Sequence, residues 1–238
     1  MINLPSLISY TTSRPNRPTF EEKYRIPDSK QTEFWDKVYT FLFAANFSSP
    51  VKRNIASYIN PLFGYFGFRA HPVTLASRYF HVGVSLDLQH GRKIYPARKG
   101  VLQYAGYGAI NGYYVLLSHP DIVTEDGYVF HTMYCHLKKT HVGFNSYQKM
   151  LRKISLNSYP IIPVDTKKIL GTASTSGVSR ENHPGLYLQC SFRKDGETPI
   201  VIDPYRLYYT NVKINETADM IDQDHIKELF EKIKKKAL

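Results

Sequence analysis

Three short segments carry histidine, tyrosine and amide side chains at the two-residue spacing of a β-strand. The first is His81–Asp87, where polar and apolar residues alternate. Side chains two or four positions apart on a strand share a face, so His81 and Ser85 point toward one place. An imidazole and a carboxylate at this spacing are suited to binding zinc, but Ser85 offers only a neutral hydroxyl. The segment therefore has half of the chemistry that such a metal site needs.

Two later segments supply further polar groups. Met133–Leu137 contains His136, and Gly185–Ser191 places Tyr187 and Gln189 two residues apart, on one face of a predicted strand. The amide oxygen of Gln189 is not among the usual ligands of zinc. The pattern thus indicates a polar site that is built from several strands and is poor in metal ligands.

In order and spacing, these segments resemble the zinc-dependent M23 (lysostaphin/LytM-type) cell-wall endopeptidases. Members of that family show a G-x-R-x-H-P lead-in, an H-x-G-x-D strand, a T-x-Y-x-H-L strand and a late H-x-H strand. The resemblance covers roughly residues 62 to 209, and its several anchors in order are specific for the fold. The matching positions are Gly67, Arg69, His71, Pro72, His81, Gly83, Gly91, Ala97, Thr132, Tyr134, His136, Leu137, Arg193, Gly196, Asp203 and Pro204.

The resemblance also implies which zinc ligands are missing. In the family, zinc is held by the His and Asp of H-x-G-x-D and by the second His of H-x-H, with water in the fourth position. Here His81 is kept, Ser85 replaces the Asp, and Tyr187 and Gln189 replace the H-x-H pair. One imidazole is not enough to hold zinc, and hydrolysis then lacks its activated water. We expect no metal, no cofactor and no hydrolytic activity, with His136 and these four residues as the remnant of the site.

A rebuilt zinc site is the alternative. Asp87 shares the face of His81 by parity, but it lies about 6.6 Å beyond the position of the family's Asp. The resemblance places His136 in the family's groove, and His183 precedes the late strand. Zinc held by His81, Asp87, His136 and His183 would support chelator-sensitive cleavage of peptidoglycan.

Other positions of the family's groove predict ligand binding. Arg69, His71 and Asp87 are the candidates. The guanidinium of Arg69 can bind the carboxylate of a peptide through two hydrogen bonds, or it can hold its own loop in place. Tyr187 can fill the volume left by the metal and bond to the polar groups around it, or it can present its ring to a peptide or sugar.

The elements before this region are predicted from composition and periodicity. Residues 1–27, rich in Pro, Ser, Thr and Arg, predict an extended arm without a core of its own. Residues 28–61 predict a helical segment, because apolar residues recur at helical spacing after a possible cap at Asp28 or Ser29. A second, shorter helix is predicted from Ser49-Pro50, where Pro takes the first helical position.

The rest of the chain predicts a mainly β domain over residues 62–210. Short runs separated by Gly, Pro, Asn and Asp indicate an all-β domain, and the resemblance implies an antiparallel LytM/lysostaphin-like sheet of the duplicated-hybrid-motif type. An insertion interrupts it at 144–162, and residues 211–238 predict a C-terminal helix with a basic tail. The predicted strands are 81–88, 93–97, 100–105, 113–118, 128–137, 168–173 and 186–193.

Composition narrows the classes of partner. Lys and Arg number 31 against 20 Asp and Glu, a net charge of +11. The positive residues are scattered and no nucleic-acid-binding motif is present, so we predict no nucleic-acid partner. No apolar run reaches about 18 residues, so no transmembrane span is predicted. Cys135 and Cys190 are too few for a disulfide scaffold; we expect two buried thiols, or one bridge if their strands are neighbours.

These features together predict a protein that binds. We expect a catalytically inactive M23 peptidase-like domain that acts as a scaffold or regulator at the bacterial cell envelope. Its partner would be an active M23 homologue, another cell-wall enzyme or a peptidoglycan peptide. The alternatives are the rebuilt zinc endopeptidase and a structural subunit that uses its terminal extensions. The first ten residues do not resemble a signal peptide, whereas the family resemblance implies the envelope or periplasm, so the compartment stays open.

Overall fold

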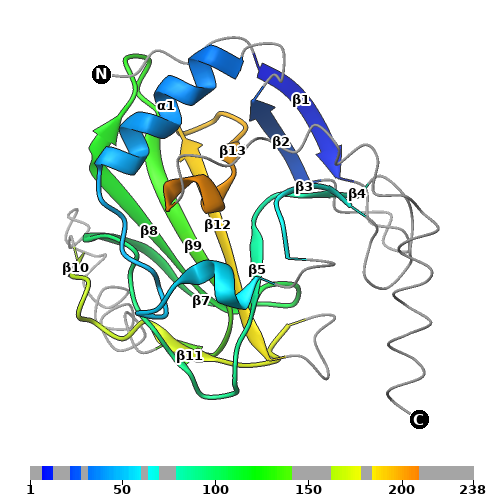
Figure 1. The fold of residues 1–238 in the computed structure, drawn as a ribbon, viewed down its shortest axis with the longest axis vertical. Helices are drawn as coiled ribbons and strands as arrows, with labels where there is room; N and C mark the ends of the chain where they lie inside the picture. Colours follow the sequence, from blue (N-terminus) through cyan, green and yellow to red (C-terminus); the bar gives the residue numbers. More distant parts are fainter. Residues whose placement is uncertain are drawn as a thin grey trace, which may run out of the picture.

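The computed structural model describes residues 7–12, 22–27, 32–59, 64–69, 79–140, 162–177 and 184–208. In these residues the chain forms a mainly antiparallel β-sheet with one α-helix packed against it (Figure 1). The expected fold class, mainly β and antiparallel, is thereby confirmed. The elements are β1 (Leu7–Thr12), β2 (Glu22–Pro27), α1 (Thr32–Ala44), the 3-10 helix η2 (Ile55–Tyr58), β3 (Gly67–Arg69), β4 (Tyr79–His81), β5 (Val84–Asp87), β6 (Lys93–Ile94), β7 (Gly100–Gly108), β8 (Gly112–Val123), β9 (Val129–Thr140), β10 (Pro163–Val164), β11 (Gly171–Ala173), β12 (Gly185–Arg193), β13 (Ile200–Ile202) and the 3-10 helix η4 (Pro204–Leu207).

The strand order brings the motif strands together. The large sheet runs β1-β2-β13-β12-β9-β8-β7-β10, and β5 also pairs with β12. Along its first half, β12 lies between β5 and β9, with Tyr187 opposite Ser85 on one side and Cys135 on the other. Along its second half, β13 replaces β5 as the neighbour of β12. Three motif segments that are far apart in the sequence therefore meet at one position of β12.

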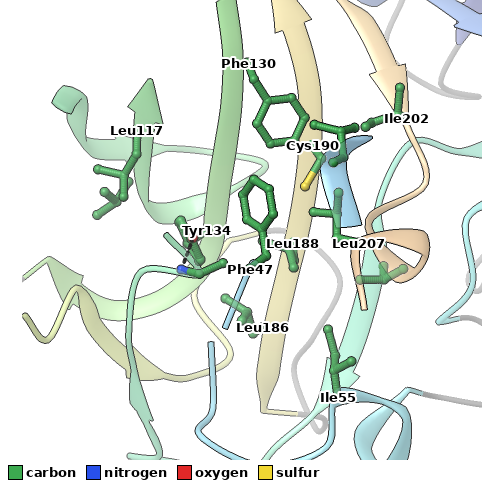
Figure 2. Close-up of a cluster of buried hydrophobic side chains, with 14 of the residues drawn as sticks. Phe47, Ile55, Leu117, Phe130, Tyr134, Leu186, Leu188, Cys190, Ile202 and Leu207 are labelled. Carbon is green, nitrogen blue, oxygen red and sulfur yellow. Dashed lines mark hydrogen bonds between the residues drawn. The ribbon is translucent and has the colours of Figure 1, made fainter. Parts of the chain in front are cut away.

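The core forms where α1, the loop after it and η4 cover the central strands. Figure 2 shows Phe47 from that loop beside Phe130 of β9 and the apolar side chains of β12. The Phe47 and Phe130 rings meet edge to face, with 5.4 Å between their centroids. Tyr134 is fully buried, and its hydroxyl accepts a hydrogen bond of 2.7 Å from the Ala97 backbone N–H. This bond satisfies a backbone group that would cost about 1–3 kcal/mol if it were buried alone.

Helix α1 is fixed to the C-terminal part of the described sheet. Its buried face includes Trp35, Val38 and Leu42, at the helical spacing that the sequence predicts. On the same helix, the Tyr39 hydroxyl accepts a 2.9 Å hydrogen bond from the backbone N–H of Asp203. Arg206 of η4 pairs with Asp36 and lies over the Tyr39 ring, 3.9 Å from its centroid. The helix therefore joins residues that are some 165 positions apart.

The predicted second helix is not an α-helix. Lys52 has a φ of +56°, a left-handed conformation that cannot continue an α-helix. The chain instead turns at Ser49–Lys52 and begins the 3-10 helix η2 at Ile55, where the Asn54 side chain accepts from the Ala56 N–H. Pro50 thus lies in a turn and not at the first position of an α-helix, because Lys52, two residues later, has the left-handed conformation.

The first predicted strand is divided, and part of the arm joins the sheet. β4 ends at His81 and β5 begins at Val84. Within residues 1–27, expected as an extended arm, β1 and β2 form an antiparallel hairpin, and Arg25 of β2 lies opposite Ile200 in parallel pairing with β13. The Arg25 N–H donates to the Pro199 carbonyl at 2.9 Å, which explains the pairing.

Several expectations fall on residues that the structure does not describe. They are the caps at Asp28 and Ser29, most of the 144–162 insertion and the C-terminal helix. The domain boundaries stay predictions. Cys135 and Cys190 are both buried thiols, on the neighbouring strands β9 and β12. In the part of the chain that is described, no helix is both long and apolar enough to cross a bilayer.

Candidate functional site

Five of the predicted residues form what we call the histidine–tyrosine cluster: His81, Ser85, His136, Tyr187 and Gln189. They come from four strands that meet around the first half of β12. β4 and β5 supply the first two, β9 supplies His136, and β12 supplies the last two. The site therefore exists because β12 pairs with β5 and β9 at the same residue.

His81 is held with a defined tautomer. Its side chain is 3% exposed, and Nδ1 lies 2.7 Å from the backbone oxygen of Tyr65. A carbonyl only accepts, so Nδ1 carries the proton and Nε2 is the acceptor of the ring. The Ser85 hydroxyl, 3.4 Å away, donates weakly to Nε2. The imidazole nitrogen that a metal would use thus has a hydroxyl donor as its neighbour.

His136 is held in an unusual backbone conformation. Its φ is +62°, which costs an L-residue about 1 kcal/mol or more. The backbone N–H donates to Asn111 at 2.8 Å, and the carbonyl accepts from both the N–H and the hydroxyl of Ser174 at 3.0 Å. Nδ1 donates to the Ser176 carbonyl at 2.8 Å, which again makes Nε2 the acceptor nitrogen. Four hydrogen bonds therefore fix both the strained backbone and the ring.

Tyr187 contacts both histidines. Its ring centroid lies 5.3 Å from that of His81 and 6.2 Å from that of His136. Gly83 makes this position possible, because a Cβ there would lie 2.8 Å from the Tyr187 ring and 2.5 Å from the Leu188 carbonyl oxygen. The ring is partly exposed. It thus packs against both imidazoles and still presents a surface to a ligand.

Gln189 completes the cluster with a buried amide. Its side chain is 1% exposed, and its oxygen accepts a long, 3.5 Å hydrogen bond from the Tyr187 hydroxyl. Among the described residues, its Nε2 has no hydrogen-bond partner. A buried donor of this kind costs about 1–3 kcal/mol when it is unsatisfied. The Nε2 donor of Gln189 therefore has no hydrogen-bond acceptor among the described residues.

These residues do not fit a zinc ion. Only His81 and His136 are ordinary zinc ligands, while Ser85 and Gln189 contribute a neutral hydroxyl and an amide. Within the described residues, no group of three His, Cys, Asp or Glu side chains is placed to hold a metal ion.

The remaining predicted residues lie at the margin of the cluster or outside the described ranges. Asp87 is exposed at the end of β5, opposite Gly185. The backbone of Arg69 ends β3, opposite Tyr79 of β4. His71 and His183 are outside the described residues, so the ligand-binding role of His71 and the rebuilt zinc set stay predictions.

Sequence reasoning missed the groups that hold the histidines. The Tyr65 carbonyl and the turn of Ser174 and Ser176 orient the rings of His81 and His136. The Ser-Thr-Ser run was a possible signal for the turn, since such residues often bond to nearby backbone. Another missed residue, His119, is fully buried on β8, and burial lowers its pKa to about 4.

Comparison with protein-family models and with curated protein sequences gives no match. Solved structures do match. A zinc-containing peptidase from Vibrio cholerae is 19% identical with a TM-score of 0.45, and the match covers 71% of this chain and 41% of that protein. The catalytic domain of lysostaphin, an antimicrobial peptidase from Staphylococcus simulans, is 18% identical with a TM-score of 0.39 and coverage of 61% and 89%.

The catalytic domain of the prophage-encoded M23 protein EnpA from Enterococcus faecalis is 14% identical, with a TM-score of 0.43 and coverage of 66% and 95%. This chain therefore spans less than half of the Vibrio cholerae protein and most of the two catalytic domains. The chain resembles M23 peptidases both in its motifs and in the solved structures that it matches.

Proposed function

We propose that this chain binds a peptide of the bacterial cell wall at the histidine–tyrosine cluster without cleaving it. It would serve as a scaffold or regulator for an active M23 homologue or another cell-wall enzyme. The observation that carries the proposal is the position of Tyr187, whose partly exposed ring packs against both His81 and His136, two histidines that an M23-type zinc site would hold close to the metal.

The chemistry of the cluster favours binding over hydrolysis. Its members are neutral near pH 7 apart from any protonation of the histidines, and none is a carboxylate. Without a Lewis acid, the two imidazoles can accept or relay a proton but cannot lower the pKa of water to the neutral range. The described cluster is thus suited to hydrogen bonds with amide and carboxylate groups.

A peptide would meet complementary groups here. Gln189, only 1% exposed, lies below the surface and positions the ring by accepting a 3.5 Å hydrogen bond from the Tyr187 hydroxyl. The partly exposed ring of Tyr187 offers a flat apolar surface beside it. The exposed part of the Tyr187 ring would therefore contact an apolar or planar part of the peptide.

Metal content is the first test. Protein purified without chelator should contain far less than one zinc per chain by elemental analysis, and it should leave peptidoglycan and glycine-rich peptides uncleaved. A stoichiometric zinc ion, together with cleavage that a chelator abolishes, would overturn the proposal and favour the rebuilt site.

Binding is the second test. Titration of the full chain with soluble peptidoglycan peptides, followed by calorimetry, should give saturable binding that Tyr187→Ala weakens about tenfold or more. Tyr187→Phe should retain most of it, because the ring remains. The matched control is Tyr107→Ala, which removes an exposed tyrosine outside the cluster. Equal affinity in all variants would place the peptide elsewhere and refute the role of the cluster.

A further inference from the structure

A concave site is lined by residues outside the histidine–tyrosine cluster. It has a volume of about 530 Å3, and it is formed by the loop after α1, the residues after β6 and the turn after β10. Pockets of a few hundred Å3 are the size that small ligands occupy. We call it the basic hollow. Its lining residues are Ser48, Ser49, Lys52, Arg53, Tyr95, Pro96, Thr166 and Lys167.

The backbone of the hollow is firmly built. The Ser48 N–H donates to the Ala97 carbonyl at 2.6 Å, and the Tyr95 N–H donates to the Pro50 carbonyl at 2.9 Å. The N–H of Lys52 closes a turn onto the Ser49 carbonyl at 3.1 Å. The loop after α1 and the segment after β6 are thus tied together at both ends of the hollow. Its walls are therefore set by backbone hydrogen bonds.

The lining is rich in donors and positive charge. Lys52, Arg53 and Lys167 contribute three cations, and Ser48, Ser49 and Thr166 contribute three hydroxyls, while no lining residue is acidic. The Lys52 ammonium lies 3.9 Å from the centroid of the Tyr95 ring, which holds it at the wall.

The nearest acidic residue along the chain is already engaged. Asp165 precedes the lining turn, and its Oδ1 accepts from the backbone N–H groups of Lys167 at 2.7 Å and Lys168 at 3.0 Å. Within the described residues, no ion pair neutralises Lys52, Arg53 or Lys167. The hollow therefore keeps a net positive charge, which favours the binding of an anion.

We propose that the basic hollow binds a phosphate-bearing anion with at least two negative charges, about the size of a diphosphate. Three cations need more than one negative charge in return, which a single carboxylate does not supply. Phosphate groups also offer several acceptor oxygens in different directions, as the mixture of ammonium, guanidinium and hydroxyl donors requires. Lys52 and Arg53 of the loop after α1 and Lys167 of the turn after β10 line the same hollow, so each phosphate group of a diphosphate has a cation to pair with.

The test uses the full chain and inorganic pyrophosphate. Calorimetric titration at about 0.15 M salt should show one saturable site, with inorganic phosphate binding more weakly and citrate, a carboxylate of similar charge, more weakly still. Lys52→Gln combined with Lys167→Gln should weaken pyrophosphate binding at least tenfold. Arg53→Gln alone should weaken it several-fold, since the guanidinium supplies both charge and paired donors.

The matched control is Lys194→Gln. Its ammonium also lies over a tyrosine, 5.6 Å from the centroid of the Tyr128 ring, but it does not line the hollow. Its affinity for pyrophosphate should stay within twofold of the unchanged protein. The proposal is overturned by an absence of saturable binding up to millimolar pyrophosphate, by an equal loss in Lys194→Gln, or by citrate binding as tightly as pyrophosphate. The last two results would mean that the overall charge attracts any anion.

Discussion

Acid should destabilise the fold through His119. The ring is fully buried, with Nδ1 donating to the Lys99 carbonyl at 2.9 Å and Nε2 accepting from the Thr132 hydroxyl at 2.9 Å. The Phe47 and Phe130 rings lie beside it, each with its centroid 5.8 Å away. The two aromatic rings and the two hydrogen bonds stabilise the neutral form of the imidazole. Burial lowers the pKa of His119 from 6.5 to about 4, although the Lys99 carbonyl and Asp121 favour the charged form.

The magnitude follows from linkage. A pKa lower in the folded state means that the unfolded chain binds the proton more tightly, so stability falls as the pH falls below 6.5 and reaches its limit near pH 4. The full loss corresponds to about 3 kcal/mol. Between pH 7.5 and pH 5 about 2 kcal/mol of it should be seen, a measurable part of a typical folding stability of roughly 5–15 kcal/mol.

Urea unfolding at pH 7.5, 6.5, 5.5 and 5.0 measures the effect. His119→Gln keeps an amide donor and acceptor and does not titrate in this range. Between pH 7.5 and pH 5, the free energy of unfolding of the variant should therefore fall by about 2 kcal/mol less than that of the unchanged protein. The variant should be less stable at pH 7.5, because it loses ring contacts. Asp203, whose pKa burial raises to about 6, titrates in both proteins and cancels in the difference. The pKa of His131, which burial lowers to about 4, is lowered to a lesser extent by the charge of His119, so its contribution cancels only in part. Parallel curves for the two proteins would refute the reasoning.

Two further predictions concern the cluster. Gly83→Ala should lower the free energy of unfolding by about 1–3 kcal/mol, because its Cβ would press on backbone and on the Tyr187 ring. The control is Gly108→Ala, where a Cβ meets only an ordinary 3.5 Å contact. Equal losses of the two variants in denaturant unfolding would contradict the packing argument. Ser85→Asp with Gln189→His should raise the zinc content toward one per chain by elemental analysis, since it restores ligand types beside His81. Zinc content unchanged from the starting protein would show that the cluster has lost the geometry as well as the ligands.

Periodicity and motif order were enough to find the strands and to bring the cluster together. Ser85, Tyr187 and Gln189 follow strand parity, and the register places Ser85 opposite Tyr187. The sequence could not show how His136 is aimed, because its φ of +62° depends on acceptors and donors from loops far along the chain. Local sequence patterns do not indicate which distant residues supply these hydrogen-bond partners.

The turn at Lys52 illustrates the other limit. Ser49-Pro50 is a good beginning for a helix, but the Pro50 carbonyl accepts from Tyr95 and the Val51 carbonyl accepts from the Arg92 guanidinium at 3.2 Å. These contacts with distant residues override the helical preference of the segment. The same contacts shape the loop that lines the basic hollow, and no sequence motif predicts this hollow.

The pairing of β2 with β13 has a consequence for synthesis of the chain. Arg25 lies opposite Ile200, so the hairpin of β1 and β2 cannot join the sheet until nearly all of the described chain has left the ribosome. Contacts with such wide sequence separation slow folding, since a long loop must close before they form. The Arg25 guanidinium adds a 3.0 Å hydrogen bond to the Tyr128 hydroxyl of the segment before β9, which fastens the late-arriving hairpin to strands that can pair earlier. Between the emergence of β13 and the docking of the hairpin, β13 is an open edge, to which the hairpin of a second nascent chain could bind.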